Sequence, residues 1–441
     1  MAEDAAELMA GYYAGIWPAE CGGPRRQKIA AQGGLAVSAD ERLAATPRDT
    51  GRWNVMFVWR DESELYLHGT MPPADPHPHG WVERVDPRTL EVIDASPDLP
   101  CGGHIWCGAV VVHANGDLYV VNGSYLHRLS PRLAIVAELK LPVDGAHNGI
   151  LVMPDGNLVT KDLRLSGVPS ELTVIEPDRL TVVSQTRMPE PSMGRISADR
   201  RRGIDAVYAP GDQHIFRFIY GDGWLRLDEN WQPAYRDHGE SAHGRAWDTC
   251  IGDGSVWLHD NGDVSAVHQI FATHPAGSKE PQPAPNHFTG PQRLIRVAID
   301  DPADIDVTTP FDRPGGFVIA PPLYDPLRHI AVSFDTANGL VGAHRYVRSS
   351  GLEQLWTRPV RNSWQPILFQ TTGELILDDF TGQPTLDDNL VVLDIETGEE
   401  KARCMTGSLR PNGMFPCPGR ERDVYYCSAP SVARVFVAPT P

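Results

Sequence analysis

The chain has 441 residues, of which 41% are hydrophobic, and it contains 41 glycines and 39 prolines. Its 57 acidic and 39 basic residues give a formal net charge of −18, which argues against nucleic-acid binding because that function needs clustered cations. The sequence has no run of eighteen apolar residues, so no membrane helix and no membrane partner are predicted.

The first segment, residues 1–30, is predicted to form a short helical arm that packs against the rest of the chain. It begins MAEDAAELMAGYYAGIW, with acidic residues early and without the basic stretch and apolar core of a secretory signal. We therefore expect a cytoplasmic location. The seven cysteines fit this expectation, since free and buried thiols are typical of a reducing compartment.

From residue 31 onward the chain repeats a unit of about 48 residues. Each unit opens with an apolar run, continues through a turn into a second β-rich run such as GDLYVVNG, and adds a third such as YLHRLSP. Most units then add a fourth run. Alternating β-branched and aromatic residues between Gly, Asp, Asn and Pro turns indicate strands. The residues that open the units are Trp53, His104, His147, Arg195, His243, Gly316, Trp364 and Asn412.

Four antiparallel strands per unit, repeated around an axis, are typical of a β-propeller. The predicted fold class is therefore all-β, with one propeller domain of eight four-stranded blades over residues 31–441. Seven blades are the alternative, if the first unit is miscounted. The last unit stops after its third strand, so we expect the N-terminal region around GGLAVSADERL, residues 33–43, to supply the outer strand and close the ring. One unit carries 25 extra residues, 264–288, which are predicted to form an inserted loop over the channel.

The residues that open the inner strands are predicted to lie together around one mouth of the central channel. Equivalent positions of successive blades are neighbours in a propeller, and four consecutive units supply the catalytic candidates His104, His147, Arg195 and His243. The loops between second and third strands reach the same face, where their aspartates are expected to be mainly turn formers. The other substrate-binding residues expected at this mouth are Trp53, Lys161, Trp364 and Asn412.

Three neutral imidazoles from separate strands suit a divalent transition metal, and three protein ligands leave a position for water or substrate. We therefore predict a divalent metal ion, with a transition metal favoured over calcium, at His104, His147 and His243. Arg195 would hold the anionic group of a small polar metabolite, and the predicted activity is that of a lyase or hydrolase. Without a metal, the same residues form an acid–base or group-transfer site.

A non-catalytic propeller is the alternative from another class. Propellers fill their channels with polar side chains, and a histidine there can simply bond to its neighbours. An acidic chain with a polar mouth can also bind a protein or a ligand on that face without catalysis. Asp248 is predicted to orient His243 or to pair with Arg245, and a buried structural ion pair is equally plausible.

Two stretches, RPNGMFPCPGRERDVYYC and AHNGILVMPDGNLVTKD, resemble the repeated unit of the gluconolactonase, senescence-marker and strictosidine-synthase-like propellers. In the calcium-dependent members an asparagine of that unit binds the central ion, and Asn148 and Asn412 are the matching positions. Those families have six blades and hold their ion mainly through carboxylates and amides, so three histidines favour a softer metal or none. Eight-bladed quinoproteins match the blade number, but their tryptophan-docking repeats are absent.

Overall fold

A computed structural model describes residues 2–70, 77–104, 107–164, 167–236, 246–260, 290–316, 318, 320–363, 365–380, 387–408, 414–428 and 430–441. Within these ranges the chain is almost entirely β, with a short α-helix, α1 (Ala2–Leu8), and a 3-10 turn, η1 (Glu20–Gly22). None of the helices among these residues is long and apolar enough to cross a membrane. The predicted insertion at 264–288 lies outside the described residues.

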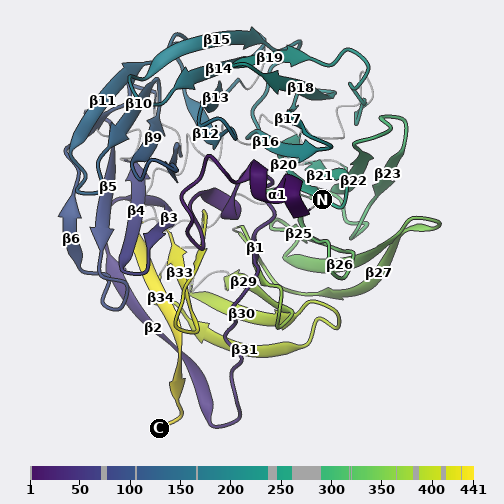
Figure 1. Ribbon diagram of the computed structural model, residues 1–441. Helices are drawn as coiled ribbons and strands as arrows, with labels where there is room; N and C mark the ends of the chain where they lie inside the picture. Colours follow the sequence, from purple (N-terminus) through teal and green to yellow (C-terminus); the bar gives the residue numbers. More distant parts are fainter. Residues whose placement is uncertain are drawn as a thin grey trace.

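Eight antiparallel sheets surround a central axis, which confirms the eight-bladed propeller and shows that the alternative of seven blades is wrong (Figure 1). Blade 1 contains β3 (Trp53–Asp61), β4 (Glu64–Thr70), β5 (His79–Val85) and β6 (Val92–Ala95), and β7 (Leu99–Pro100) also pairs with β5. Blade 2 contains β8 (Ala109–Val112), β9 (Leu118–Asn122), β10 (Tyr125–Leu129) and β11 (Ile135–Lys140). Blade 3 contains β12 (His147–Val152), β13 (Leu158–Asp162), β14 (Glu171–Glu176) and β15 (Thr181–Arg187). Blade 4 contains β16 (Ser197–Arg201), β17 (Ile204–Pro210), β18 (Ile215–Gly221) and β19 (Trp224–Leu227).

The second half of the ring follows the same plan. Blade 5 contains β20 (Ala246–Gly252), β21 (Ser255–Asp260), β22 (Arg293–Ala298) and β23 (Ile305–Thr308). Blade 6 contains β24 (Leu323–Asp325), β25 (Ile330–Asp335), β26 (Leu340–Val347) and β27 (Gly351–Arg358). Blade 7 contains β28 (Ile367–Phe369), β29 (Glu374–Phe380), β30 (Asp388–Asp394) and β31 (Glu400–Met405), and β1 (Ile29–Ala30) pairs in parallel with β28. Blade 8 contains β32 (Cys417–Pro418), β33 (Asp423–Cys427) and β34 (Ser431–Pro439), with β2 (Glu41–Asp49) as its outer strand.

The N-terminal region closes the ring as predicted, but from a later stretch of sequence. Strand β2 pairs antiparallel with β34 over nine positions, from Glu41 opposite Pro439 to Asp49 opposite Ser431. The predicted stretch, 33–43, overlaps this strand only at its last three residues. Gly33, Gly34 and Ala36 have positive φ angles of 91°, 145° and 43°, so the backbone turns before the strand begins.

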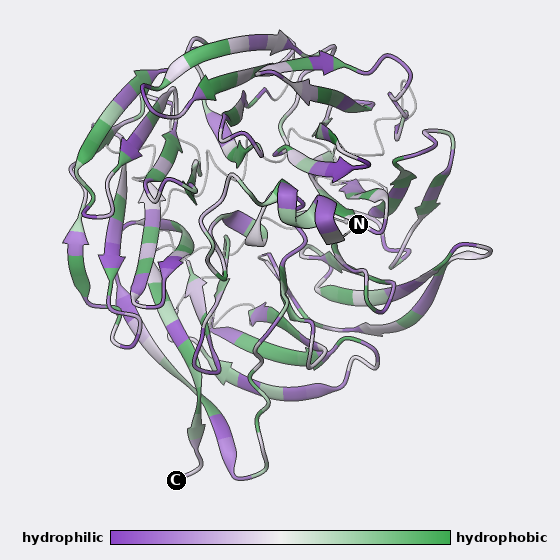
Figure 2. Cartoon of the chain, viewed as in Figure 1, coloured by the Kyte–Doolittle hydropathy of each residue, from purple (hydrophilic) through white to green (hydrophobic). Residues whose placement is uncertain are grey.

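Strand burial follows distance from the axis. Every residue of the inner strand β8 is buried, whereas exposed and half-buried residues alternate along most of the outer strands β11 and β31. Hydrophobic and hydrophilic residues accordingly alternate along many of the outer strands in Figure 2. The core therefore lies between neighbouring blades: Trp257 of blade 5 stacks on Tyr324 of blade 6, with ring centroids 4.4 Å apart.

Residues 11–30, named here the N-terminal plug, cross the central channel (Figure 1). Backbone N–H groups of the inner strands donate to plug carbonyl oxygens at 2.8–3.0 Å. The donor and acceptor pairs are Trp59 to Trp17, Val112 to Pro18, Ala198 to Pro24, Ile251 to Arg25 and Leu368 to Lys28. The predicted packing arm is thus an element that bonds to five separate blades.

The plug lies towards one end of the channel. Trp59, Val112 and Ile251 stand near the ends of their inner strands, where the turns between first and second strands begin. We call that side of the ring the turn face. The opposite side, which carries the residues that open the inner strands and the loops between second and third strands, is the mouth face.

Candidate functional site

His147 opens the inner strand β12 and is completely buried. Its Nδ1 lies 3.0 Å from the carbonyl oxygen of Gly123 and 3.1 Å from that of Gly145. Two carbonyl acceptors require a proton on Nδ1, so Nε2 carries a lone pair. Nε2 has no hydrogen-bond partner within the described ranges, and burial lowers the pKa of the ring. His147 is therefore a neutral imidazole whose buried Nε2 carries a lone pair without a partner among the described residues.

Lys161 lies beside His147, near the end of β13, and is also fully buried. Its Nζ donates to the carbonyl oxygens of Asp162 and Ser192, at 2.9 and 2.8 Å. Burial lowers the pKa of this ammonium to about 7. Asp162 is the partner of His147 in the β12–β13 ladder, and the charge of Lys161 also lowers the pKa of His147. Two groups with lowered pKa values thus share the mouth of blade 3.

Trp53, another residue expected at the mouth, is buried, and so is Asn148, which follows His147 in β12. The Asn148 side-chain amide donates to the carbonyl oxygen of Met193 at 2.7 Å. Its Oδ1 has no hydrogen-bond partner in the part of the chain that the structure describes. Asn148 therefore adds an acceptor oxygen next to His147, on the residue that the gluconolactonase-like resemblance matches to an ion ligand.

His104 has different surroundings from His147, although their main chains are neighbours. Gly123 lies between them. It is so close to His104 that a Cβ atom added to the glycine would lie 2.4 Å from the His104 carbonyl oxygen, and the Gly123 carbonyl oxygen accepts the backbone N–H of His147. The His104 side chain is 39% exposed, and its Nε2 lies 3.4 Å from the carboxylate of Asp144, which is 64% exposed. The structure thus places one predicted histidine in a buried site and the other at the surface.

The predicted three-histidine metal centre cannot be assembled from the described residues, because His243 lies outside them, as do Trp364 and Asn412. Within the described ranges, no three His, Cys, Asp or Glu side chains gather in a way that would hold a metal ion. The metal at His104, His147 and His243 stays a prediction. All seven cysteines are free thiols and six of them are buried, as the sequence led us to expect.

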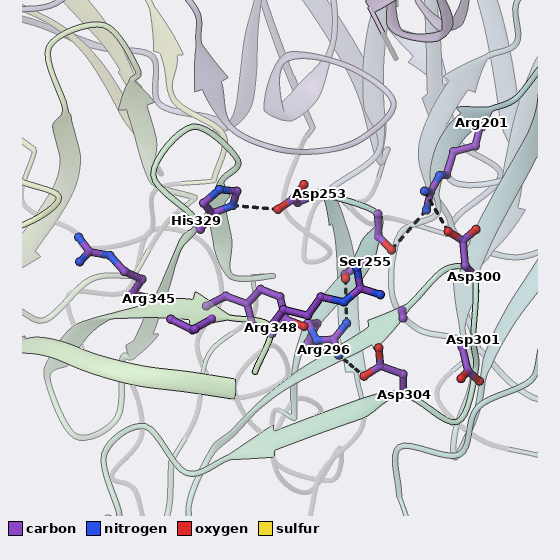
Figure 3. A pocket seen from close by; sticks show the side chains of 14 residues that line it. Arg201, Asp253, Ser255, Arg296, Asp300, Asp301, Asp304, His329, Arg345 and Arg348 are labelled. Carbon is purple, nitrogen blue, oxygen red and sulfur yellow. Dashed lines mark hydrogen bonds and ion pairs between the residues drawn. The ribbon is translucent and has the colours of Figure 1, made fainter. Parts of the chain in front are cut away.

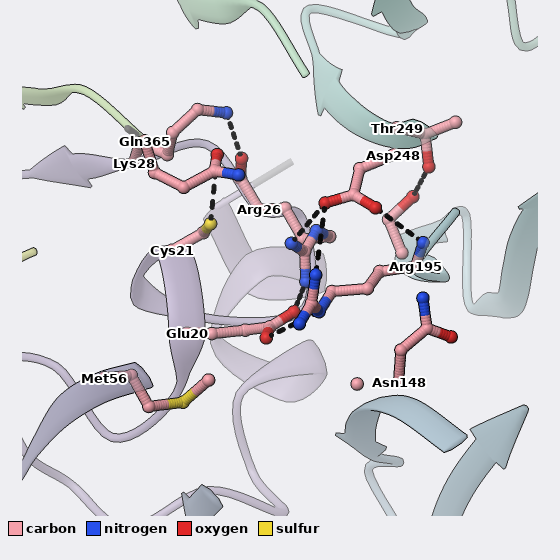
Figure 4. A network of polar contacts seen from close by, with 12 residues as sticks. Glu20, Cys21, Arg26, Lys28, Met56, Asn148, Arg195, Asp248, Thr249 and Gln365 are labelled. Carbon is pink, nitrogen blue, oxygen red and sulfur yellow. Dashed lines mark hydrogen bonds and ion pairs between the residues drawn. The ribbon is translucent and has the colours of Figure 1, made fainter. Parts of the chain in front are cut away.

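A buried ion cluster joins the N-terminal plug to blades 4 and 5 (Figure 4). Arg26 of the plug pairs with Glu20 and, at 3.0 Å, with Asp248 of β20. Glu20 also lies 3.1 Å from Nε of Arg195, and Asp248 accepts the Arg195 backbone N–H at 2.6 Å. The four residues are only 1–6% exposed, so the cluster is sealed from solvent.

This cluster changes the expected roles of two residues. Arg195 was expected to hold a substrate anion, but its guanidinium pairs with Glu20 and lies 4.6 Å over the ring of Phe415. Asp248 pairs with Arg26 of the plug, while the two partners proposed for it, His243 and Arg245, lie outside the described residues. Arg195 therefore contributes charge to the channel from a position where it is already paired.

A pair of buried carboxyl groups lies in blade 7. Asp378 accepts the backbone N–H and the hydroxyl of Ser363 at 2.7 and 2.6 Å. The hydroxyl of Tyr426 donates to one oxygen of Asp388, and the other oxygen has no hydrogen-bond partner among the residues described. Burial, with a contribution from Asp379, raises the pKa of Asp378 to about 7. Burial and the two neighbouring aspartates raise the pKa of Asp388 well above its usual range.

Sequence reasoning missed Glu20, Arg26 and Asp388. The two plug residues lie in ECGGPRRQK, residues 20–28, which has no strand or helix period. Asp388 opens a third strand, a position that the repeat analysis treated as part of a turn. The one unusual feature of this stretch is a pair of adjacent arginines after Gly-Gly-Pro, and it does not by itself predict a segment that crosses the channel.

No family model matches this chain, and no curated protein matches it. Several solved structures do match it. A quinohemoprotein alcohol dehydrogenase from Comamonas testosteroni aligns with 100% of this chain and 85% of its own, with a TM-score of 0.58 and 12% identity. The Dos1 propeller covers 90% of this chain and 95% of its own, with a TM-score of 0.57 and 7% identity. BamB from Moraxella catarrhalis covers 89% and 97%, with a TM-score of 0.51 and 12% identity. These likenesses support a β-propeller and single out neither an activity nor the gluconolactonase-like group.

Proposed function

We propose that the mouth of blade 3 binds a small anionic metabolite and that His147 accepts a proton from it, as in a lyase or hydrolase. The observation that carries this proposal is the imidazole of His147, which is buried, fixed through Nδ1 and without a partner at Nε2. An unmet buried hydrogen bond costs about 1–3 kcal/mol. A ligand that bonds to Nε2 would remove that cost.

Another buried histidine, His259, has a partner on each ring nitrogen, whereas His68 and His127, like His147, each leave one ring nitrogen without a partner among the described residues. Nδ1 of His259 lies 3.1 Å from the carbonyl oxygen of Ala320, and its Nε2 lies 3.2 Å from the hydroxyl of Ser333. Burial lowers its pKa to about 3. Both nitrogens of His259 are used, whereas Nε2 of His147 has no partner among the described residues and the charge of Lys161 acts on its ring.

The preference for an anion follows from charge along the axis. Arg26, Lys28, Arg195 and Lys161 are buried there, against the carboxylates of Glu20 and Asp248. Asp162 is paired with its own arginine, Arg164. Glu20 and Asp248 balance Arg26 and Arg195, so Lys28 and Lys161 are the cations of this group without a carboxylate partner among the residues described, and in a poorly solvated channel their charge favours an anionic ligand.

The chemistry available there is proton transfer beside an anionic group. Neutral His147 can accept a proton through Nε2, and the ammonium of Lys161 can stabilise negative charge that develops on the substrate. The pKa of Lys161, about 7, places that ammonium near its midpoint at neutral pH. The plug lies towards the turn face, so the substrate would approach from the mouth face.

A metal-dependent site is the second candidate, and the same observation favours it. Metal-binding histidines usually donate the other ring N–H to a carbonyl or carboxylate, as His147 does to Gly123 and Gly145. Nε2 of His147 would then be one ligand, with His104 and His243 as the other predicted ligands. A bound transition metal would supply Lewis-acid activation of water or substrate.

Thermal unfolding of the full chain with phosphate and a panel of small hydroxycarboxylates, whose hydroxyl group can donate to Nε2, with and without Zn²⁺ or Mn²⁺, tests both candidates. A bound anion should raise the melting temperature of the wild type and of His259→Gln, but not that of His147→Gln. Stabilisation by metal alone, lost in His147→Gln, would select the second candidate. Equal stabilisation of all three proteins by every anion, or of none, would overturn the assignment of His147.

A further inference from the structure

A cavity of about 630 Å³ lies on the turn face where blades 5 and 6 meet (Figure 3). Its walls come from the β20–β21 turn (253–255), the β22–β23 turn (298–304) and the end of β26 with the turn that follows (345–348), together with His329 and Arg201. These turns lie on the side of the ring opposite the mouth. The cavity is therefore separate from the site of His147, and its volume is in the range of sites for small molecules.

Most charges in the cavity are already paired. Arg201 lies 3.1 Å from Asp300, and His329 lies 2.8 Å from Asp253. Arg296 pairs with Asp304, and also with Asp306 at 2.6 Å. These ion pairs connect the walls of the cavity, and they neutralise most of the charge of the residues that form them.

Two opposite charges remain, one on each side. Arg348, after β26 of blade 6, has no ion-pair partner among the described residues. The carboxylate of Asp301, in the β22–β23 turn of blade 5, accepts only the backbone N–H of Ala303, at 3.0 Å, and has no cationic partner within the same ranges. In Figure 3 Arg345 lies on the left, Arg348 in the middle of the view, and Asp300 and Asp301 on the right.

The rest of the lining suits a ligand with a short apolar body between its charges. The guanidinium of Arg296 lies 4.6 Å over the ring of Tyr346 and donates to the hydroxyl of Ser255 at 3.1 Å. Ala298 and Val347 add apolar surface to the same lining. A fully anionic ligand would face Asp300, Asp301 and Asp304, and a fully cationic one would face Arg345 and Arg348, so neither fits both walls.

We propose that this cavity binds a small zwitterion, an amino acid or a short peptide, through its two termini. The carboxylate pairs with the guanidinium of Arg348, which presents a planar fork to it. The ammonium pairs with the carboxylate of Asp301. This inference does not depend on the proposed function of the mouth, because the two sites lie on opposite faces.

Isothermal titration of the full chain with trialanine tests the proposal, with N-acetyl-trialanine and trialanine amide as ligands that each lack one charge. We expect trialanine to bind at least about tenfold more tightly than either blocked form. Arg348→Gln should abolish the preference for the free carboxylate, and Asp301→Asn should abolish the preference for the free ammonium.

Matched controls come from the exposed β18–β19 region, where Arg226→Gln and Asp222→Asn change the same charges away from the cavity and should leave all three affinities unchanged. His147→Gln should also leave them unchanged, which separates this test from that of the mouth. Absence of trialanine binding at millimolar concentration would overturn the proposal. Equal binding of free and blocked peptides, or equal losses in the control variants, would overturn it as well.

Discussion

Asp248→Asn should weaken the attachment of the plug to the ring. The substitution keeps the volume of the side chain but removes the carboxylate that pairs with Arg26 at 3.0 Å, leaving three buried cations, Arg26, Lys28 and Arg195, with Glu20 alone. Removing one partner of a buried ion pair typically costs about 3–5 kcal/mol. The unfolding entropy of a chain of 441 residues is about 0.9 kcal/mol per kelvin, so the melting temperature should fall by roughly 3–5 °C.

Thermal unfolding followed by circular dichroism measures this fall. Limited proteolysis at 25 °C should also cut within residues 11–30 faster in the variant, because the plug is held less tightly. Glu421→Gln is the matched control: it breaks the ion pairs of Glu421 with Arg88 and Arg434, but the Glu421 side chain is 51% exposed, so the substitution should cost about 0–1 kcal/mol. An Asp248→Asn shift no larger than that of Glu421→Gln would refute the view that the ion cluster fastens the plug.

Three further outcomes follow from burial. Asp378 holds its proton in the folded state up to about pH 7, whereas an unfolded aspartate releases it near pH 3.8. The free energy of unfolding should therefore fall by up to about 4 kcal/mol as the pH rises from 3.8 to 7. Urea titrations at several pH values should show a flatter pH dependence for Asp378→Asn. Lys161 should change the stability in the opposite direction. Between about pH 7 and 10.5 the unfolded chain keeps the Lys161 proton and the folded chain does not, so the free energy of unfolding should rise with pH there, and Lys161→Met should remove that rise. Burial raises the pKa of the Cys21 and Cys107 thiols to about 12 and 11, so these two thiols should react with a thiol reagent only after denaturation. Rapid labelling of Cys21 or Cys107 in the native chain, located by peptide mapping, would contradict their burial.

The propeller could be predicted because its signal is local and repeated. Each blade carries its own strand and turn pattern, and eight copies of that pattern fix the ring and the position of His147 at the start of β12. The closing strand was also predictable, since blade 8 lacks a fourth strand of its own. Its start at Glu41 was not, because positive φ angles at Gly33, Gly34 and Ala36 delay it.

The plug could not be predicted because its contacts occur once each. Pro18, Pro24 and Arg25 offer their carbonyl oxygens to three different blades, and no repeat encodes such pairings. The direction in which each histidine side chain points could not be predicted from the repeat either. His104 and His147 open successive units, yet the first contacts an exposed carboxylate and the second is buried against two carbonyl oxygens.

The central claim, that His147 presents a basic Nε2 to the channel mouth, is tested most directly by ¹⁵N NMR of the histidine rings, with His147→Gln used to assign the resonance. We predict a neutral ring protonated on Nδ1 above pH 6.5, because burial holds its pKa below that usual value, and a shift of the Nε2 resonance when a hydroxycarboxylate binds. A ring protonated on Nε2, or one that gains a second proton above pH 6.5, would contradict the account.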